Sequence, residues 1–475
     1  MSEQYKNVRA TLSRRQALKL LGAGAGMATL AACVAPSGPS GGAAGEGSAA
    51  PSEAPTSMVV AHRAEYFQEM ETIFADAVKA WGAENNIEVE TTVVAAEATQ
   101  DFVPKTIAAV EAGNPPDLIY HVRLTQQLYF YEALQPVSDT VEQAIEAYGD
   151  PSSGHFRVNQ IDGEWWAVPF INNGGGSFAR RSLFEAIGVD PLTDLGTFDA
   201  IREACLEVSN PDEEIYGWGR TVNQGGDGQG TVTDILRNWG VYITNADLTE
   251  LTFNSPEAVA AVEWLSEIYT SDTYAPMLPP GILAWTDSSN NEAYLAGNIA
   301  YTSNAASVYA KAKADGNPLF EDTVVLNVPV GPRGEQLISG GGDGQMYIPT
   351  GAKATEQAKQ LALHMLNPDI FLPISLVSAG LFLPAYDNYY TMDSVIEAFE
   401  ADPNLQRLGE QRQGDDIGLS EPADPNPYID ALSAQAVFNN MILEVITQGV
   451  SPADAVANAE GRMRQIGAEM GVTFS

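Results

Sequence analysis

The feature that most constrains the fold is an alternation of short apolar runs with longer amphipathic segments. Residues 58–61 form an apolar run suited to a buried strand, and residues 65–81 carry apolar side chains at helical spacing. A β-rich run at 87–94, a helical pattern at 101–112 and an apolar run at 117–120 follow. Strand, helix, strand, helix, strand is the order found in parallel sheets, so the sequence predicts an α/β protein.

Further helices are predicted downstream, and the clearest of them begins at Ser255. Ser255 is suited to an N-cap, Pro256 to the first helical position and Glu257 to the first turn. The other predicted helices span 182–187, 197–208, 355–366, 434–447 and 452–466. With 475 residues, of which 45% are hydrophobic, the chain is long enough for more than one core. We therefore expect two lobes.

The charge balance excludes one class of partner. The chain has 62 acidic and 24 basic residues, a net charge of −38, and its first 32 residues are basic. Such a surface repels phosphate backbones, so no nucleic-acid binding is expected, and it does not favour lying on anionic lipid. Two readings of the acidity remain: a solubilising surface, or a field that attracts a cationic ligand.

Residues 1–32 have the anatomy of an export signal. Arg14 and Arg15 precede a weakly apolar stretch at 20–30, and small residues lead to Cys33. The paired arginines resemble a twin-arginine signal, and Leu30-Ala31-Ala32-Cys33 resembles a lipobox, in which the Cys thiol is lipidated. The alternative is a single membrane anchor, but the stretch is shorter than the ~20 residues needed to span a bilayer.

The segment that follows Cys33 is composed almost entirely of Gly, Ala, Ser and Pro as far as residue 57. Such a composition cannot build a core, so 33–57 is predicted to be a lipidated Cys with a flexible linker. Cys205 is the only other cysteine, so lipidation of Cys33 leaves no possible intrachain disulfide. We expect an exported protein held at the outer face of the cytoplasmic membrane by its lipid alone.

Several segments, in order along the chain, resemble extracellular solute-binding proteins of family 1, the sugar-binding lipoproteins of ABC transporters. The motifs include Asn-Pro-Pro-Asp before a strand, a Gly-containing hairpin that ends in Val-Pro, and a helix that reads NSPEAVAAVEWLSEIY. These and the other matching segments lie at 114–119, 162–169, 178–189, 254–269, 292–303, 340–366 and 451–455.

This resemblance implies a two-lobed, type II periplasmic-binding-protein-like fold whose lobes are joined by a multi-strand hinge. The N-terminal lobe would comprise 58–168 plus 330–376, and the C-terminal lobe 170–327 plus 380–475, with crossings near 168–171, 326–330 and 375–381. A solute would be captured in the interlobe cleft by hinge closure and delivered to the ABC permease subunits. The implied ligand is a carbohydrate or related polyol, the protein a monomer, and no cofactor or metal is implied.

The loops that follow strands are the places to look for ligand contacts, because ligands bind outside the carboxyl ends of strands in open α/β sheets. Polar side chains there can both donate to and accept from sugar hydroxyls. Asn172 and Asn173 follow the first expected crossing, although Asn-Asn-Gly-Gly-Gly is equally suited to a turn. The candidates from these loops are His62, Arg63, Glu65, Tyr66, His121, Arg123, Asn172 and Asn173.

The second group of candidates comes from Gly-rich or polar loops and from tryptophans, whose indole rings can pack on the apolar face of a sugar. The Gly-rich loop lacks the lysine and the spacing of a phosphate-binding loop. At Asn304-Ala305-Ala306 the family usually has Gly-Pro-Trp, so the stacking tryptophan common there is missing. The candidates are Trp218, Asp227, Gln229, Trp239, Trp285, Asp287, Asn304 and Asp343.

A secreted carbohydrate-active enzyme is the main rival interpretation. No G-x-S-x-G nucleophile motif occurs, and the four histidines have no metal-ligand spacing, so no enzyme is predicted. A binder of peptides or polyamines is the other alternative. The acidic surface favours it, whereas cationic side chains at Arg63 and Arg123 would repel a polyamine.

Overall fold

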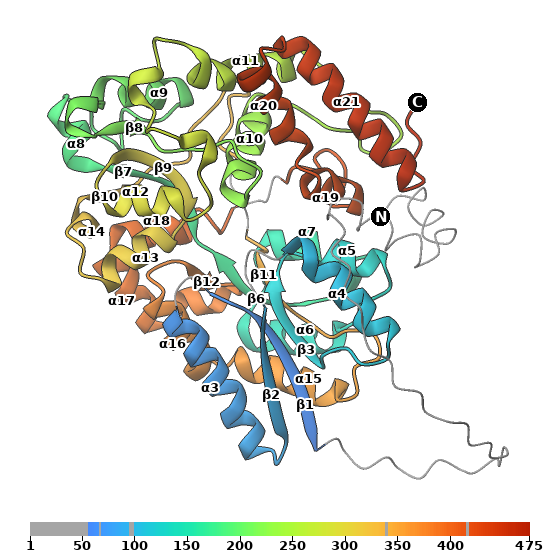
Figure 1. Ribbon diagram of the computed structural model, residues 1–475. Coiled ribbons are helices and arrows are strands. Elements are labelled where there is room, and N and C mark those ends of the chain that lie inside the picture. The colour runs from blue at the N-terminus through green and yellow to red at the C-terminus, as the bar shows by residue number, and fades with distance from the viewer. Residues whose placement is uncertain (1–55, 66–67, 95–98, 338–340, 415–417) are drawn as a thin grey trace, which may run out of the picture.

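The computed structural model describes residues 56–65, 68–94, 99–337, 341–414 and 418–475, which form two α/β lobes (Figure 1). The first lobe contains a six-stranded sheet of order β12-β6-β11-β3-β1-β2. Its strands are β1 (Ser57–Arg63), β2 (Glu88–Val94), β3 (Leu118–Val122), β6 (Val168–Asn173), β11 (Gly344–Tyr347) and β12 (Phe382–Pro384). The three strands predicted before residue 122 pair in parallel, which confirms that part of the prediction.

Alternating side chains place the two faces of this sheet against different helices. Val60 and Tyr120 point into one cluster together with α3 (Gln68–Glu84). Ala61 and Ile119 point into the other cluster, which includes residues of α4 (Thr99–Glu111) and α5 (Thr125–Phe130). Because successive side chains of a strand point to opposite faces of the sheet, the helices on both faces bury side chains of the same strand. The pairing register then fixes which residues lie at the carboxyl edge of the sheet.

The second lobe is built on a four-stranded sheet of order β10-β7-β9-β8. Its strands are β7 (Gly175–Arg180), β8 (Tyr216–Trp218), β9 (Ile299–Ala305) and β10 (Thr323–Val325). The predicted start of α11 (Pro256–Thr270) is confirmed, since the Ser255 side chain accepts a hydrogen bond from the Ala258 N–H at 3.1 Å. The apolar faces of this lobe's main helices gather in one core: α9 (Phe198–Val208), α10 (Gly226–Asn238), α11, α20 (Val437–Gln448) and α21 (Pro452–Glu469).

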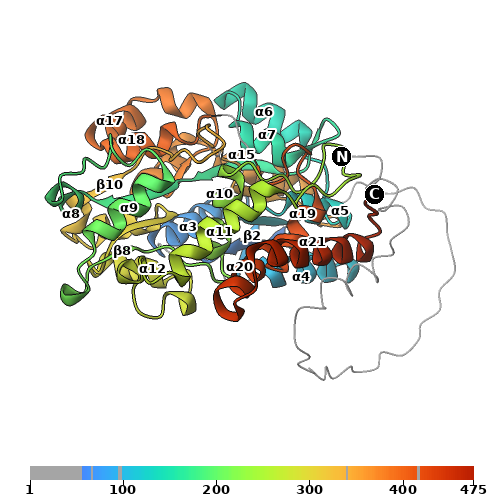
Figure 2. The same cartoon turned by 90° about the horizontal axis from the view of Figure 1, so that it is seen from above.

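The remaining elements connect and cover the two sheets (Figure 2). A hairpin expected at 162–169 is present, with Asp162 and Gly163 both at positive φ in its turn. The elements are α6 (Ser138–Tyr148), α7 (Ser153–Asn159), β4 (Gln160–Ile161), β5 (Glu164–Trp165), α8 (Arg181–Ala186), η2 (Pro211–Glu213), η3 (Ala275–Met277), η4 (Ile282–Ala284), α12 (Ser289–Leu295), α13 (Ser307–Ala314), α14 (Leu319–Asp322), α15 (Thr355–Met365), α16 (Pro368–Val377), η5 (Asp387–Thr391), α17 (Asp393–Ala401), α18 (Pro403–Glu410) and α19 (Pro427–Ala434).

The chain first passes between the sheets at Gly174. Its N–H donates to Leu381 O at 2.9 Å, and its carbonyl accepts from the Ala306 N–H at 2.8 Å, so this one residue is bonded to both lobes. A Cβ at this position would lie 1.7 Å from Gly380 O, which only glycine avoids.

The pairing of β12 differs from the expected third crossing. Residues from 380 onward were assigned to the second lobe, but β12 pairs antiparallel with β6 in the first sheet. The third crossing was placed from the resemblance of the sequence to a family, which does not fix it to the residue. A strand of three residues also leaves little periodic signal in the sequence.

The expected export signal, Cys33 and Tyr66 lie outside the described residues. Among the helices that the structure does describe, none combines the length and the apolarity that crossing a membrane requires.

Candidate functional site

The carboxyl ends of β1 and β3 bring Glu65, Arg63 and Tyr120 together. Glu65 Oε1 accepts a hydrogen bond from the Tyr120 hydroxyl at 3.0 Å and lies 3.0 Å from Arg63 Nε. Only 4% of the Glu65 side chain is exposed. Burial raises the pKa of Glu65 to about 7, although Arg63 and Tyr120 oppose this rise. Near neutral pH this carboxyl is therefore able either to donate or to accept a hydrogen bond.

The two histidines of these strands are buried, and the structure corrects the expectation that both face a ligand. His62 follows Val60 by two residues, so it lies on the core face of β1, with its ring 5.3 Å from that of Phe74. His121 stacks on Phe102 at 4.3 Å and is fully buried. Burial lowers the pKa of His121 to about 3, assisted by Arg63, so its ring is neutral.

Arg123 connects the end of β3 to the loop that leads into β11. Its Nη2 donates to Gly341 O at 2.8 Å, and its Nε donates to Gly342 O at 3.2 Å. Nη2 also lies 3.4 Å from Asp343 Oδ1, and Asp343 Oδ2 accepts the Asn173 N–H at 3.2 Å. Arg123, Asp343 and Asn173, all expected as ligand contacts, are thus adjacent at the first-lobe edge, where Arg123 and Asp343 remain partly exposed.

Asn172 has a different role from the one expected. Its Oδ1 accepts from the Gly342 N–H at 2.8 Å and from the Ser152 hydroxyl at 3.1 Å, while its Nδ2 donates to Pro384 O at 3.0 Å. The residue is 1% exposed. Because strand alternation turns Asn172 away from the side of Asn173, its amide holds the hinge strands together and is not available to a ligand.

On the second lobe, Asp287 and Asp227 meet at the start of α10. The Asp287 carboxylate accepts the Gly226 and Asp227 N–H groups at 2.9 and 3.0 Å, so it caps this helix. Burial raises the pKa of Asp227 to about 6, and Asp287 contributes to the rise. Gln229 donates to Gln224 O at 2.9 Å within the same loop. The structure therefore brings Asp227 and Asp287 together and places Gln229 beside them.

An amide chain that the sequence analysis missed extends this group toward the hinge. Asn290 Nδ2 donates to Asp227 Oδ2 at 2.9 Å, and the Asn304 side-chain amide donates to Asn291 Oδ1. Asn304 lies opposite Gly176 in the β7–β9 pair, next to the first crossing. The available signal was the consecutive pair Asn290-Asn291, two amides at the start of a short helix.

Of the three candidate tryptophans, two are core residues, and the expectation that they contact a ligand is corrected. Trp218 is 0% exposed and donates to the Tyr269 hydroxyl at 3.1 Å, while Trp239 packs 4.8 Å from Trp264. Trp285 is partly buried, and its carbonyl accepts a hydrogen bond from the Asn223 amide. Trp285 is thus the candidate tryptophan that is not fully buried, and its backbone carbonyl is bonded to the Gly-rich loop of the second lobe.

The two polar walls flank the first crossing: Asn173 of the first-lobe wall ends β6, and Asn304 of the second-lobe wall lies opposite Gly176 in β7. The first-lobe wall consists of Arg63, Glu65, Arg123, Asn173 and Asp343, and the second-lobe wall consists of Asp227, Trp285, Asp287, Asn290, Asn291 and Asn304. Amides, carboxylates and guanidinium groups donate and accept hydrogen bonds in several directions, which suits a hydroxylated molecule. Within the described ranges no cluster of three or more His, Cys, Asp or Glu side chains has the arrangement of a metal site.

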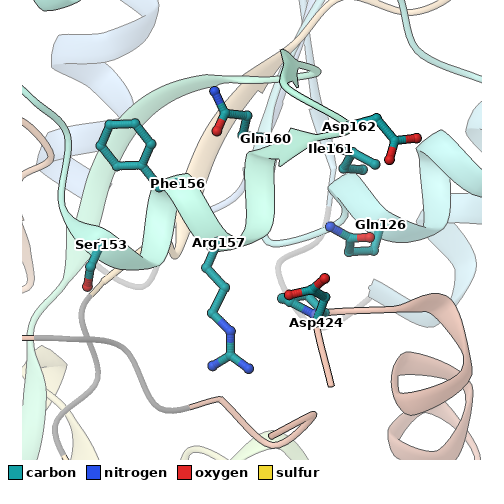
Figure 3. A pocket seen from close by; sticks show the side chains of 9 residues that line it. Gln126, Ser153, Phe156, Arg157, Gln160, Ile161, Asp162 and Asp424 are labelled. Atoms are coloured by element: carbon teal, nitrogen blue, oxygen red, sulfur yellow. The ribbon is translucent and has the colours of Figure 1, made fainter. Parts of the chain in front are cut away.

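A cavity of about 390 Å³ lies at the seam between the first lobe and the segment that leads into α19 (Figure 3). It was not predicted from the sequence, because its walls come from distant segments. First-lobe residues form most of the wall, and the second-lobe contribution comes from residues 424 and 425. The lining residues are Gln126, Ser153, Phe156, Arg157, Gln160, Ile161, Asp162, Asp424 and Pro425.

Comparison with solved structures places this architecture among ABC transporter solute-binding proteins. The structure of one such protein from Thermotoga lettingae, bound with α-D-tagatose, superposes with a TM-score of 0.72 at 15% identity and covers 86% of this chain and 99% of that one. A maltose-bound protein of T. maritima gives the same TM-score and coverage at 18% identity. A ribitol complex from Agrobacterium radiobacter gives 0.70 at 15% identity, with 87% of this chain and 99% of that chain covered. These likenesses establish the two-lobed fold.

Sequence comparisons agree with the fold. A probable ABC transporter-binding protein of Deinococcus radiodurans is 21% identical over 318 residues, which cover 65% of this chain and 70% of that protein. The family model described as bacterial extracellular solute-binding protein matches residues 76–407, more than half of the chain. Membership of this family makes the chain a transport protein, not an enzyme. The chain belongs to the bacterial extracellular solute-binding proteins.

Proposed function

We propose that this protein captures a carbohydrate or related polyol between its lobes and delivers it to the permease of an ABC importer. The observation that carries the proposal is that two groups of hydrogen-bonding side chains flank a crossing at which one glycine, Gly174, is bonded to both lobes. Proteins of the same fold have been solved bound to tagatose, to maltose and to ribitol, which supports a hydroxylated ligand. Hinge closure over such a ligand changes the surface presented to a permease.

The composition of the walls supports an uncharged ligand over a polyamine. Arg63 and Arg123 each lie within ion-pair distance of an acid, Glu65 and Asp343 respectively. A polycation entering the first-lobe wall would have to displace these arginines from their carboxylates, at a Coulomb cost. A sugar hydroxyl needs only lone pairs and N–H groups that remain available beside the ion pairs.

We further propose that the protein is exported, works as a monomer and is held at the membrane by lipid on Cys33. The linker that follows, about 24 residues, keeps the binding lobes within tens of ångströms of the membrane and raises their effective concentration at the permease. Cys33→Ser is expected to release the protein from membranes without changing its ligand affinity. Membrane fractionation measures the release, and persistent association of the variant contradicts the anchor.

A thermal-shift screen tests the ligand class. Sugars, polyols, peptides and polyamines are each added to the purified protein, because a ligand that binds only the folded state raises Tm by mass action. We expect at least one sugar or polyol to raise Tm, and the same compound to have less effect on the Asp343→Asn variant. Asp212→Asn, which removes an exposed acid of η2 that belongs to neither wall, is the matched control. A rise with polyamines alone would refute the proposed ligand class.

A further inference from the structure

Helix α18 lies along the outer edge of the second sheet. Strand β10 ends the order of that sheet, with β7 on one side, and both views place α18 beside β10 (Figures 1 and 2). Asn404 of α18 takes the place of a neighbouring strand: its Oδ1 accepts the Val325 N–H at 2.9 Å, and its Nδ2 donates to Thr323 O at 2.8 Å. Backbone groups at a sheet edge need partners, so these bonds attach the helix to the second lobe.

The start of α18 is also bonded to another second-lobe helix. The Asp402 carboxylate accepts the N–H groups of Asn404 and Leu405 at 3.0 and 3.1 Å, so it caps α18. The same carboxylate accepts the hydroxyl of Tyr309, in α13, at 2.9 Å. The direction of α18 is therefore set by the second lobe.

The residues that follow α18 reach the first crossing. The Leu326 N–H donates to Ser177 O of β7 at 2.8 Å, and Gln411 Nε2 donates to Leu326 O at 2.9 Å. Two residues before Ser177, Gly175 O accepts a hydrogen bond from Arg412 Nη2 at 3.2 Å. Carbonyls two residues apart on a strand point to the same side, so Arg412 bonds β7 where β10 would do so if it continued.

The apolar side of α18 contacts a residue that leads into the first sheet. Leu405 and Leu408 are 5% and 0% exposed. A Cβ on Gly380 would lie 2.8 Å from Leu408 Cδ1 and 3.0 Å from Leu405 Cδ1, so both leucines lie close against this glycine. Gly380 precedes β12 of the first sheet, and its carbonyl faces Gly174. A helix fixed to the second lobe thus packs on a first-lobe residue that touches the crossing.

The crossing itself has little stiffness of its own. Residues 174–176 are three consecutive glycines, which restrict the backbone less than any other residue type. Asn173 of the first-lobe wall precedes them, and Asn304 of the second-lobe wall lies opposite Gly176. Rotation about these glycines moves one wall relative to the other, so contacts that restrain them also set how the walls are placed.

We propose that α18 and the two residues after it form a hinge brace, which restrains the first crossing from the second lobe. Arg412 is the positioning residue that carries the restraint to Gly175. The brace consists of Asn404, Leu405, Leu408, Gln411 and Arg412. It acts in the unliganded protein, so it goes beyond the proposed function and does not depend on the ligand class. Without it, the three glycines sample more conformations and the lobes vary more in their relative placement.

Two arginines of this segment form a matched pair for the test. Arg407 Nη1 donates to Val325 O at 3.3 Å, a bond within the second lobe, whereas Arg412 Nη2 donates to Gly175 O at the crossing. Both side chains are partly buried. Truncation to alanine removes one guanidinium in each case, so a difference between the two variants reports on the crossing and not on a general loss of stability.

Hydrogen exchange of the full-length protein, measured by mass spectrometry without ligand, tests the restraint locally. We expect Arg412→Ala to raise the exchange rate of the fragment that contains residues 174–176 about tenfold, because a hydrogen bond from a charged donor is lost. Arg407→Ala should leave this rate unchanged, and fragments of α21 should be unchanged in both variants. An equal rise in α21 would show general unfolding and would overturn a restraint at the crossing.

Interlobe distances test the consequence. Spin labels are attached at Glu111→Cys on the first lobe and Glu257→Cys on the second, in a Cys33→Ser background; both sites are exposed, and the native Cys205 is buried. Pulsed electron spin resonance then reports the distance distribution. We expect a broader distribution in Arg412→Ala than in the parent protein. Arg412→Lys should be broadened less, since its ammonium is still able to donate to a carbonyl.

The outcomes that would overturn the brace are specific. A cooperative thermal transition confirms that each variant is folded, and Arg412→Met, which keeps the apolar stem but no donor, replaces the alanine variant if that one does not fold. An unchanged distribution in the folded variant, or equal broadening in Arg407→Ala, would refute the role of Arg412. Equal effects of lysine and alanine would refute the role of its bond to Gly175. Neither measurement uses a ligand, so failure of the ligand screen would leave these results standing.

Discussion

The two walls of the candidate site are built in different ways. The first-lobe wall is made of opposite charges at strand ends, where Arg63 pairs with Glu65 and Arg123 with Asp343. The second-lobe wall is made of amides and a helix-capping carboxylate, with Asn290 bonded to Asp227 and Asn304 bonded to Asn291. Paired charges at strand ends are fixed in place by the sheet and by each other. Amides on a loop and a short helix offer donors and acceptors of either kind at lower desolvation cost.

We expect the two walls to contribute differently to binding. A rigid first wall presents a preset pattern of charge-assisted hydrogen bonds, which are the stronger and more directional ones. If a ligand is captured as proposed, we expect the second wall to adapt to it as the lobes close and to contribute one indole, that of Trp285.

Gly174→Ala is expected to disconnect the walls and to have the largest effect. The new Cβ would lie 1.7 Å from Gly380 O, so the backbone that joins β6 to β7 must move. We expect a loss of about 4 kcal/mol or more in the free energy of unfolding, or failure to fold. Urea denaturation measures it, with Gly461→Ala in α21, where a Cβ meets nothing within 4 Å, as the control. Equal stability of the two variants would contradict the hinge geometry.

Glu65 is expected to make the first wall sensitive to pH. Its pKa is raised from 4.5 to about 7, so the folded protein holds a proton that the unfolded chain releases. Its stabilising contribution is therefore present below about pH 4.5 and is lost as the pH rises through about 7. The difference in unfolding free energy between wild type and Glu65→Gln should change by on the order of 3 kcal/mol over this window.

Urea denaturation at several pH values measures this difference. Glu111→Gln, which removes an exposed first-lobe acid, is the control and should show no such change. A wild-type and Glu65→Gln difference that is flat between pH 4.5 and 7 would show that Glu65 does not retain its proton on folding.

Asn290→Ala breaks the second wall at the bond to Asp227. The carboxylate is left partly buried without this donor, which costs about 1–3 kcal/mol of unfolding free energy. Loss of the donor should also raise the pKa of Asp227 further, because this hydrogen bond lowers it. Thermal denaturation measures the stability, and Asn458→Ala, an exposed amide on α21, is the control. A variant as stable as the control would mean that the amide chain does not support this wall.

Gln229→Ala is expected to have the smallest effect. Its side-chain amide bonds to Gln224 O in an exposed part of the loop, where water replaces the lost donor. We expect a change within about 0.5 kcal/mol in unfolding free energy, measured by the same denaturation. A loss comparable to that of Asn290→Ala would show that the Gly-rich loop, and not the amide chain, supports the second wall.

Some features of the fold and of the two walls can be predicted from the sequence alone, and others cannot. Parallel pairing of β1, β2 and β3 and the start of α11 at Ser255 were predictable, because periodicity and capping act locally. Arg63, Glu65, Arg123 and Asp287 could be proposed as ligand contacts because strand ends and polar loops are visible in the sequence, and these assignments stay predictions. Trp218 and Trp239 were misassigned, since an indole in a core and one in a cleft look alike until the chain is folded.

The remaining errors have one cause, which is that long-range pairing decides them. Asn172 and Asn173 are neighbours in the sequence, but their side chains lie on opposite faces of β6. The Asn172 side chain is buried among the hinge strands, and the Asn173 side chain is not. Strand β12 joins the first sheet through β6, more than 200 residues earlier in the chain. The contact between α5 and α19 brings Phe130 into a core made of residues far along the sequence, and no local pattern in α5 predicts it.

Equilibrium binding to variants of each wall tests most directly the claim that a solute is held between the two lobes. Tagatose, maltose, ribitol and laminaribiose are titrated calorimetrically into the wild type, Asp343→Asn, Asn290→Ala and the double variant. We expect at least one compound to bind the wild type and each single variant to weaken that compound about tenfold, with coupling between the two changes. Binding that depends on one wall only, or no binding by any compound, would contradict the account.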